Sequence, residues 1–132
     1  MLVDTSAWIE FLRATGSPCD QALNRLLADG AALTVTGVIL QEVLQGCRSN
    51  HHAAEVGQLL SACDFVEPVF PETFEHAAAL YRRCREAGHR VRGTVDCLIA
   101  AMALEHGLTV LAHDRDFESL RRHCGVSVHE PS

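Results

Sequence analysis

Short apolar runs alternate along the chain with longer segments that have helical periodicity. The runs that we expect to form strands are residues 1–3, 33–36, 65–69, 108–112 and 126–128. Such alternation is typical of α/β proteins, in which helices connect parallel strands. We therefore predict an α/β fold with a parallel sheet, formed by one domain that spans residues 1–132.

Residues that begin and end helices separate these runs. Ser17 and Pro18 have the form of an N-cap followed by a proline at the first helical position. Thr36 and Asn50 are suited to cap two further helices. The run at residues 108–112 is as apolar as a central parallel strand should be. We expect it to follow a helix that begins at Thr94.

The composition is that of a chain with one hydrophobic core and no covalent staples. Of its 132 residues, 48% are hydrophobic. The six cysteines are widely spaced, without a C-x-x-C pair, so we expect them to be reduced and mostly buried. No segment approaches the ~20 consecutive apolar residues of a membrane span, and the N-terminus does not have the form of a signal peptide. We therefore expect a cytoplasmic protein that does not associate with membranes.

The charged residues exclude several functions. The net charge is −6, which argues against a general nucleic-acid coat protein, whose surface should be basic. All basic residues are arginines, whereas receiver-like phosphoacceptor domains and phosphatases of the haloacid dehalogenase type depend on a lysine. Such phosphatases also require a second aspartate two residues after Asp4, where this chain has Ser6.

Acidic residues occupy the ends of predicted strands and the starts of predicted helices. Asp4 and Asp114 follow the first strand and the most apolar strand, and Asp116 comes two residues later. Asp96 lies in the first turn of a helix, and Glu42 lies inside an otherwise apolar helix. If the two strands are neighbours, these carboxylates meet at the carboxyl edge of the sheet, where open α/β folds bind ligands.

Carboxylates gathered in one cleft raise one another's pKa unless a cation lies between them. Mg²⁺ and Mn²⁺ bind to a few carboxylates while retaining waters, and they support phosphoryl chemistry. Taken singly, Asp4, Asp96 and Asp114 also fit as helix caps or first-turn acids, and Asp116 fits as a helix-start acid. The prediction of a metal site therefore rests on the whole set.

Four segments resemble, in order, the motifs of VapC-type PIN-domain ribonucleases, the toxins of type II (VapBC) toxin–antitoxin systems. They are residues 3–10, 42–46, 95–103 and 111–117. The resemblance extends over nearly the whole chain, and His113 stands where the family more often has Thr, Asn or Arg. It implies a single PIN domain with a five-stranded parallel sheet and helices on both faces.

The resemblance also implies a Mg²⁺- or Mn²⁺-dependent endoribonuclease that hydrolyses RNA with a metal-activated water. The residues that match the family's acidic catalytic site are Asp4, Glu42, Asp96 and Asp114. The three aspartates among them, together with Asp116, would hold the metal. Ser6 and Thr94 stand where small hydroxyl residues support the site.

Partners follow from the same resemblance. It implies a VapB-like antitoxin that places an arginine in the acidic site, a homodimer and a larger toxin–antitoxin assembly. Apolar residues at 38–44 and 59–60 fit either a groove for this antitoxin or the core. Arg90 and Arg92 precede the Thr94 motif and are our candidates for contacts with RNA, whereas the other arginine clusters also fit solvated helix faces. A housekeeping RNA-processing nuclease and a non-catalytic PIN-fold interaction module remain as alternatives.

Overall fold

Four short parallel strands form one sheet in the order β3-β2-β1-β4. The computed structural model describes residues 1–130, so residues 131 and 132 of the predicted domain lie outside the described residues. The strands are β1 (Leu2–Val3), β2 (Thr34–Thr36), β3 (Asp64–Val66) and β4 (Val110–Leu111). β1 is central, since Leu2 pairs with Thr34 on one side and with Val110 on the other. The predicted α/β fold with a parallel sheet is confirmed.

The prediction of a fifth strand at residues 126–128 is wrong. Val128 forms only an isolated parallel bridge with Val110, so residues 1–130 contain four strands. The neighbouring strand β4 is itself only two residues long, and the backbone N–H of Val126 points to Leu120 O at the end of a helix. β3 is likewise shorter than expected, because Pro68 has no N–H to donate and the N–H of Val69 donates to Thr73 Oγ1.

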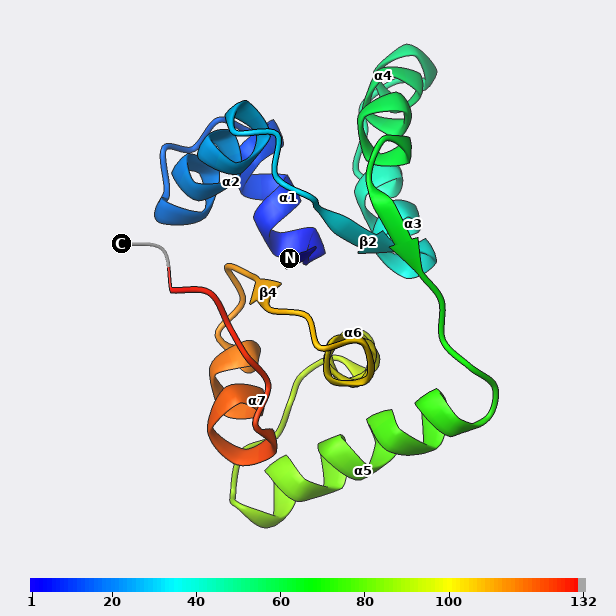
Figure 1. The fold of residues 1–132 in the computed structure, drawn as a ribbon, viewed down its shortest axis with the longest axis vertical. Coiled ribbons are helices and arrows are strands. Elements are labelled where there is room, and N and C mark those ends of the chain that lie inside the picture. The colour runs from blue at the N-terminus through cyan, green and yellow to red at the C-terminus, as the bar shows by residue number, and fades with distance from the viewer. Residues whose placement is uncertain (131–132) are drawn as a thin grey trace.

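Helices connect the strands and cover both faces of the sheet (Figure 1). In residues 1–130 they are α1 (Thr5–Leu12), α2 (Pro18–Ala28), α3 (Gly37–Gln45), α4 (Asn50–Ser61), α5 (Glu72–Glu86), α6 (Thr94–His106) and α7 (Asp116–Cys124). α1 to α4 lie on one side of the sheet, whereas α5, α6 and α7 pack together on the other (Figure 1).

The predicted helix starts are largely as expected. The side chains of Ser17 and Thr36 cap α2 and α3 by accepting hydrogen bonds from backbone N–H groups. The cap of α4 is Ser49 rather than Asn50, one residue before the predicted position. Gly107 ends α6 in the left-handed region at φ 63°, a conformation that a residue without a Cβ adopts at little cost.

The core lies between the sheet and both helical layers. Trp8 of α1 and Phe117 of α7 are among its largest fully buried side chains. Ile39, Val43 and Leu60 are buried in it as well, whereas Leu40, Leu44 and Leu59 pack against it and are only partly buried. All six cysteine thiols are free. Within residues 1–130, the helices are too short or too polar for a membrane crossing.

Candidate metal centre

The carboxyl ends of β1 and β4 lie side by side at the point where the strand order reverses. From β1 the chain crosses to β2 and β3 on one side, whereas β4 returns to the other side of β1. Open α/β sheets bind ligands in the crevice at such a reversal. The backbone N–H of Asp4 donates to Leu111 O of β4 at 2.9 Å, which places Asp4 beside the loop that carries Asp114.

Asp4 is a buried carboxylate that is held at the start of α1. Its Oδ2 accepts hydrogen bonds from the backbone N of Ser6 at 3.0 Å and from Ser6 Oγ at 2.6 Å. The same hydroxyl oxygen accepts a hydrogen bond from the backbone N of His113 at 2.9 Å. Ser6 thus connects α1 to the loop after β4. Asp4 is thus the N-cap of α1 and lies at the carboxyl end of β1.

Three further aspartates converge beside Asp4. Carboxylate oxygens of Asp96, Asp114 and Asp116 lie within 4.8 Å of one another. Asp96 comes from the first turn of α6, Asp116 begins α7, and Asp114 lies in the loop between β4 and α7. The start of α7 is fixed by Asp114, whose Oδ1 accepts a hydrogen bond from the backbone N of Asp116 at 2.9 Å. Helix starts and a strand end therefore build this cluster, as the sequence predicted.

Glu42 faces the same region from α3. Its Oε1 accepts a hydrogen bond from Thr5 Oγ1 at 2.7 Å, across the boundary between α3 and α1. Thr5 was missed by the sequence analysis, although it directly follows Asp4 within the first motif. Glu42 lies outside the cluster of Asp96, Asp114 and Asp116, but its charge raises the pKa of Asp96.

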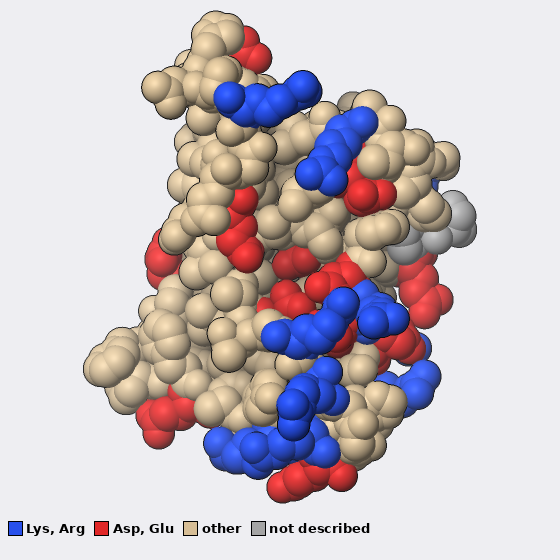
Figure 2. Space-filling view, turned by 180° about the vertical axis from the view of Figure 1, so that it is seen from behind, with Lys and Arg blue, Asp and Glu red and all other residues tan. Residues whose placement is uncertain are grey.

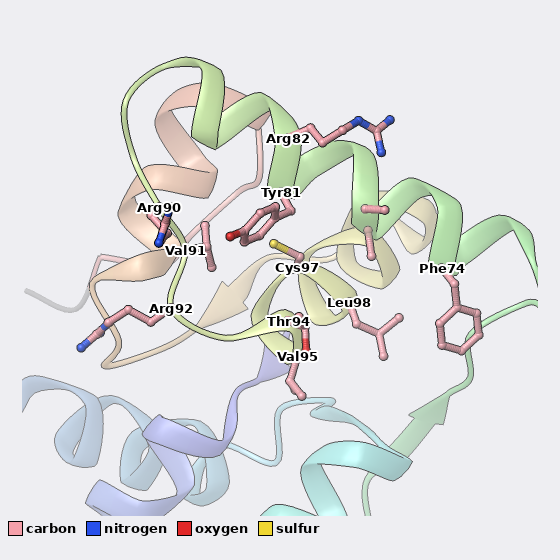
Figure 3. Close-up of a pocket in the computed structure, with 12 residues that line it drawn as sticks. Phe74, Tyr81, Arg82, Arg90, Val91, Arg92, Thr94, Val95, Cys97 and Leu98 are labelled. Atoms are coloured by element: carbon pink, nitrogen blue, oxygen red, sulfur yellow. The ribbon is translucent and has the colours of Figure 1, made fainter.

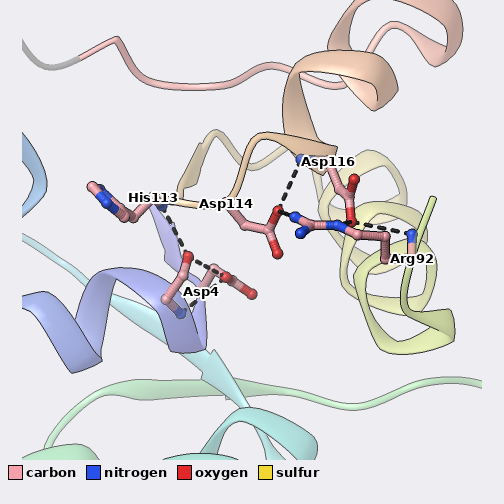
Figure 4. Close-up of polar contacts among 6 residues, drawn as sticks. Asp4, Arg92, His113, Asp114 and Asp116 are labelled. Atoms are coloured by element: carbon pink, nitrogen blue, oxygen red, sulfur yellow. Dashed lines mark hydrogen bonds and ion pairs between the residues drawn. The ribbon is translucent and has the colours of Figure 1, made fainter. Parts of the chain in front are cut away.

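Arg92 reaches into the carboxylate cluster. Its Nη2 lies 2.9 Å from Asp114 Oδ1, and its Nε lies 3.2 Å from Asp116 Oδ2. The backbone N of Arg92 also donates to Asp116 Oδ2, at 3.2 Å (Figure 4). The two arginines predicted to contact RNA therefore have different surroundings. Arg92 forms ion pairs with the acids, whereas Arg90 lies at the mouth of two cavities.

The remaining candidates lie at the edge of the site. Thr94 is exposed at the first position of α6 and lines a cavity between α5 and α6. The side chain of His113 extends away from the aspartate cluster (Figure 4), with its Nε2 at 3.7 Å from Glu10 Oε1. In the space-filling view, acidic side chains gather in a hollow in the middle of one face, with arginines along its border (Figure 2).

Burial and mutual repulsion perturb these acids. Desolvation, followed by the charges of Asp4, Asp114, Asp116 and Glu42, raises the pKa of Asp96 to about 8. Burial raises the pKa of Asp4 as well, against the two hydrogen bonds from Ser6, which lower it. The hydrogen bond to Asp116 holds the pKa of Arg92 above its usual value. These shifts favour the neutral form of Asp96 and the charged form of Arg92.

The chemistry of the donor set selects the kind of metal that fits. The clustered ligand atoms are carboxylate oxygens, which suit hard divalent cations that keep several waters. Softer metals would require thiolate or imidazole ligands. Asp96, Asp114 and Asp116 are suited to hold such a cation, with Asp4 beside them.

Comparisons with known proteins agree with this geometry. The family model described as PIN domain matches residues 1–123. The chain is 37% identical over 123 residues to VapC ribonuclease Mb1587 of Mycobacterium bovis and to ribonuclease VapC11 of Mycobacterium tuberculosis, which covers 92% of this chain and 92% of each relative. Among solved structures, DNA-bound VapBC from Salmonella typhimurium superimposes with a TM-score of 0.75 at 20% identity, covering 99% of this chain and 97% of that one.

Proposed function

The chain belongs to the PIN domain family, and from this membership we propose that it is the toxin of a VapBC-type toxin–antitoxin pair, a divalent-metal-dependent endoribonuclease formed by one domain over residues 1–132. The observation that carries the proposal is the convergence of Asp96, Asp114 and Asp116 beside Asp4, at the reversal of strand order. The relatives named ribonucleases share 37% of their residues with this chain over nearly their whole length, which supports the same activity here.

We assign the metal to the three clustered aspartates and to Asp4, and we propose Mg²⁺ or Mn²⁺ as the ion. When bound, such an ion supplies a water of lowered pKa and stabilises negative charge on a phosphate. Asp96 would release its proton as the ion binds, because its pKa of about 8 reflects burial and the surrounding negative charges. Glu42, oriented by Thr5, would accept a proton or position a water at the edge of the site.

Arg92 would change partners in this process. Its guanidinium is exposed at the rim, and its ion pairs with Asp114 and Asp116 use oxygens that a metal would require. With an ion held by these acids, the guanidinium of Arg92 would be available to phosphate oxygens of RNA, for which its planar fork is well suited. The net charge of −6 is then compatible with an RNA substrate, because bound metal belongs to the local field.

We propose a VapB-like antitoxin as the protein partner and a homodimer as the basic assembly. The solved relatives include a VapBC complex bound to DNA, and an acidic nuclease suits a basic partner. For the homodimer, the candidate surface is the exposed apolar group at β3 and the segment after it, which consists of Phe65, Val69 and Phe70.

The test of the proposed function is the cleavage of structured RNAs in Mn²⁺, in Mg²⁺ and in EDTA. The wild type is compared with an Asp4→Asn/Asp96→Asn double variant and with Asp64→Asn, an exposed aspartate of β3 at the far edge of the sheet. We expect metal-dependent cleavage by the wild type and by Asp64→Asn, and a loss of about 100-fold or more in the double variant. Equal cleavage by the double variant would point to a contaminating nuclease and refute the proposal.

A further inference from the structure

An open cavity of about 590 Å³ lies between α5 and α6, directly beside the acidic site. Val91, Val95 and Leu98 contribute much of its apolar surface, and Tyr81 and Phe74 extend aromatic rings from α5 (Figure 3). Its volume is in the range of cavities that bind small organic ligands. The metal centre itself does not use this cavity.

The cavity is continuous with the metal centre through a few residues. Arg92 lines the cavity and also pairs with Asp114 and Asp116. Thr94 and Val95, which line it too, immediately precede Asp96 in α6. A chain whose phosphate lies at the aspartates would therefore place its next unit at the mouth of this cavity.

The charge around the cavity fits an anionic ligand with an apolar body. Arg90 and Arg92 lie at its mouth and Arg82 at its outer rim, and none of its lining residues is acidic. Both mouth arginines also line a second cavity of about 480 Å³, whose other charged residues are Arg115 and Arg122 and the acids Asp116 and Glu118. Arginines thus flank the metal centre on the side where the apolar surface opens.

We propose that this cavity binds an unpaired nucleotide of the RNA, next to the phosphate that is cut. The base would lie against Tyr81 and the apolar wall, while Arg90 and Arg92 bind the flanking phosphates. Proteins recognise single-stranded RNA by stacking splayed bases on aromatic side chains and arginines, and every base offers such a face. The inference rests on the proposed nuclease function and deepens it: the cavity between α5 and α6 is a subsite for one base beside the metal centre.

The test uses two variants of the cavity wall and one matched control. Tyr81→Leu removes the aromatic face, and Leu98→Trp fills the cavity from α6. The control His51→Leu removes an imidazole ring on α4 whose side chain is 86% exposed and does not line the cavity. Circular dichroism and thermal unfolding establish that each variant folds, and Mn²⁺ titration establishes that its metal centre is intact.

Two readouts then address the cavity. Cut sites are mapped on the wild type, and KM and kcat are measured on short RNAs that keep the cut site single-stranded or pair it in a duplex. The same single-stranded RNAs, with 2-aminopurine beside the cut site, report base stacking by fluorescence quenching. We expect both cavity variants to raise KM about tenfold, as the loss of one stacked base does, and to weaken quenching, with Mn²⁺ affinity unchanged. The control should match the wild type.

Several results would overturn the inference. Unchanged KM and quenching in both cavity variants would show that no base binds there, even if the protein cleaves RNA. Equal cleavage of duplex RNA and of unpaired RNA would also show that no unpaired base binds in the cavity. If a cavity variant still binds RNA but no longer binds a co-expressed protein partner, the cavity is a binding site for that partner. A wild type that neither cuts nor binds any of these RNAs would instead refute the proposed function itself.

Discussion

Neutralising Asp96 should stabilise the metal-free protein, although the residue belongs to the proposed metal centre. The pKa of this carboxyl rises from 3.8 to about 8, first because of desolvation and then because of four neighbouring carboxylates. A carboxyl whose pKa is higher in the folded state than in the unfolded state binds more protons when folded. The stability of the protein therefore falls as the pH rises from about 4 to about 8.

The size of the effect follows from the pKa shift. Each pKa unit corresponds to about 1.4 kcal/mol, so full linkage for this carboxyl would amount to about 6 kcal/mol. Asp96 is only partly buried, and solvent screening reduces this value, so we expect about 2 kcal/mol for Asp96→Asn at pH 8. The loss of a charge from the first turn of α6 offsets only about 0.5 kcal/mol of this gain.

The assay is thermal unfolding of wild type and Asp96→Asn between pH 4 and pH 9, in EDTA and in Mn²⁺. For a domain of this size, 2 kcal/mol corresponds to a rise of about 8 °C in the melting temperature. The difference should be near zero at pH 4 and largest above pH 8. Saturating Mn²⁺ should reverse the order, because an ion at 100 times its Kd adds about 2.7 kcal/mol to the intact site.

Asp64→Asn is the matched control, since it removes the same charge from an exposed position at the far edge of the sheet. It should leave the melting temperature and its dependence on pH and metal unchanged. An Asp96→Asn variant that is no more stable than the wild type at pH 8 in EDTA would refute the reasoning. A stabilisation of equal size at every pH would also refute the reasoning. Repulsion among carboxylates acts only on the ionised form of Asp96, so the stabilisation must increase with pH.

Four further outcomes follow from the contacts of the site. Arg92→Gln removes the cation that two clustered aspartates hold, so Mn²⁺ should bind about two- to fivefold more tightly by calorimetry. Ser6→Ala deletes the hydroxyl that joins α1 to the loop after β4, and urea unfolding should show a loss of about 1–2 kcal/mol. Thr5→Val releases Glu42 and should lower kcat about tenfold with little change in melting temperature. Finally, Mn²⁺ affinity should weaken by up to about tenfold per pH unit below pH 8, where Asp96 must lose a proton.

The sequence predicted where the carboxylates gather better than it predicted the lengths of the strands. The carboxyl ends of parallel strands meet at one edge of a sheet, so Asp4 and Asp114 were expected to converge once their strands were placed side by side. Strand lengths depend instead on whether each N–H finds a partner across the sheet. Val126 and Val69 are of a residue type that strands favour. Their N–H groups, however, point to a helix carbonyl and a threonine hydroxyl.

The ion pairs of Arg92 could not be predicted from the sequence. The arginine lies 22 residues before Asp114, in a segment without regular structure between α5 and α6. Only the path of that segment brings its guanidinium back to the aspartates. The apolar cavity was hidden for a similar reason: Tyr81 and Leu98 fit an ordinary buried helix face, and the cavity depends on how α5, α6 and the segment between them pack.

Repulsion among the acids is balanced in three different ways in the metal-free protein. Asp96 keeps a proton, Asp4 accepts two hydrogen bonds from Ser6, and Arg92 supplies a positive charge to the other aspartates. In the proposed metal centre an ion would replace the first and the third, whereas the second is part of the fold. Since Arg92 also lines the proposed nucleotide cavity, an ion that displaces it from the acids also makes it available to RNA. Metal binding and RNA binding are then coupled through one side chain, and by linkage each should strengthen the other to the same degree.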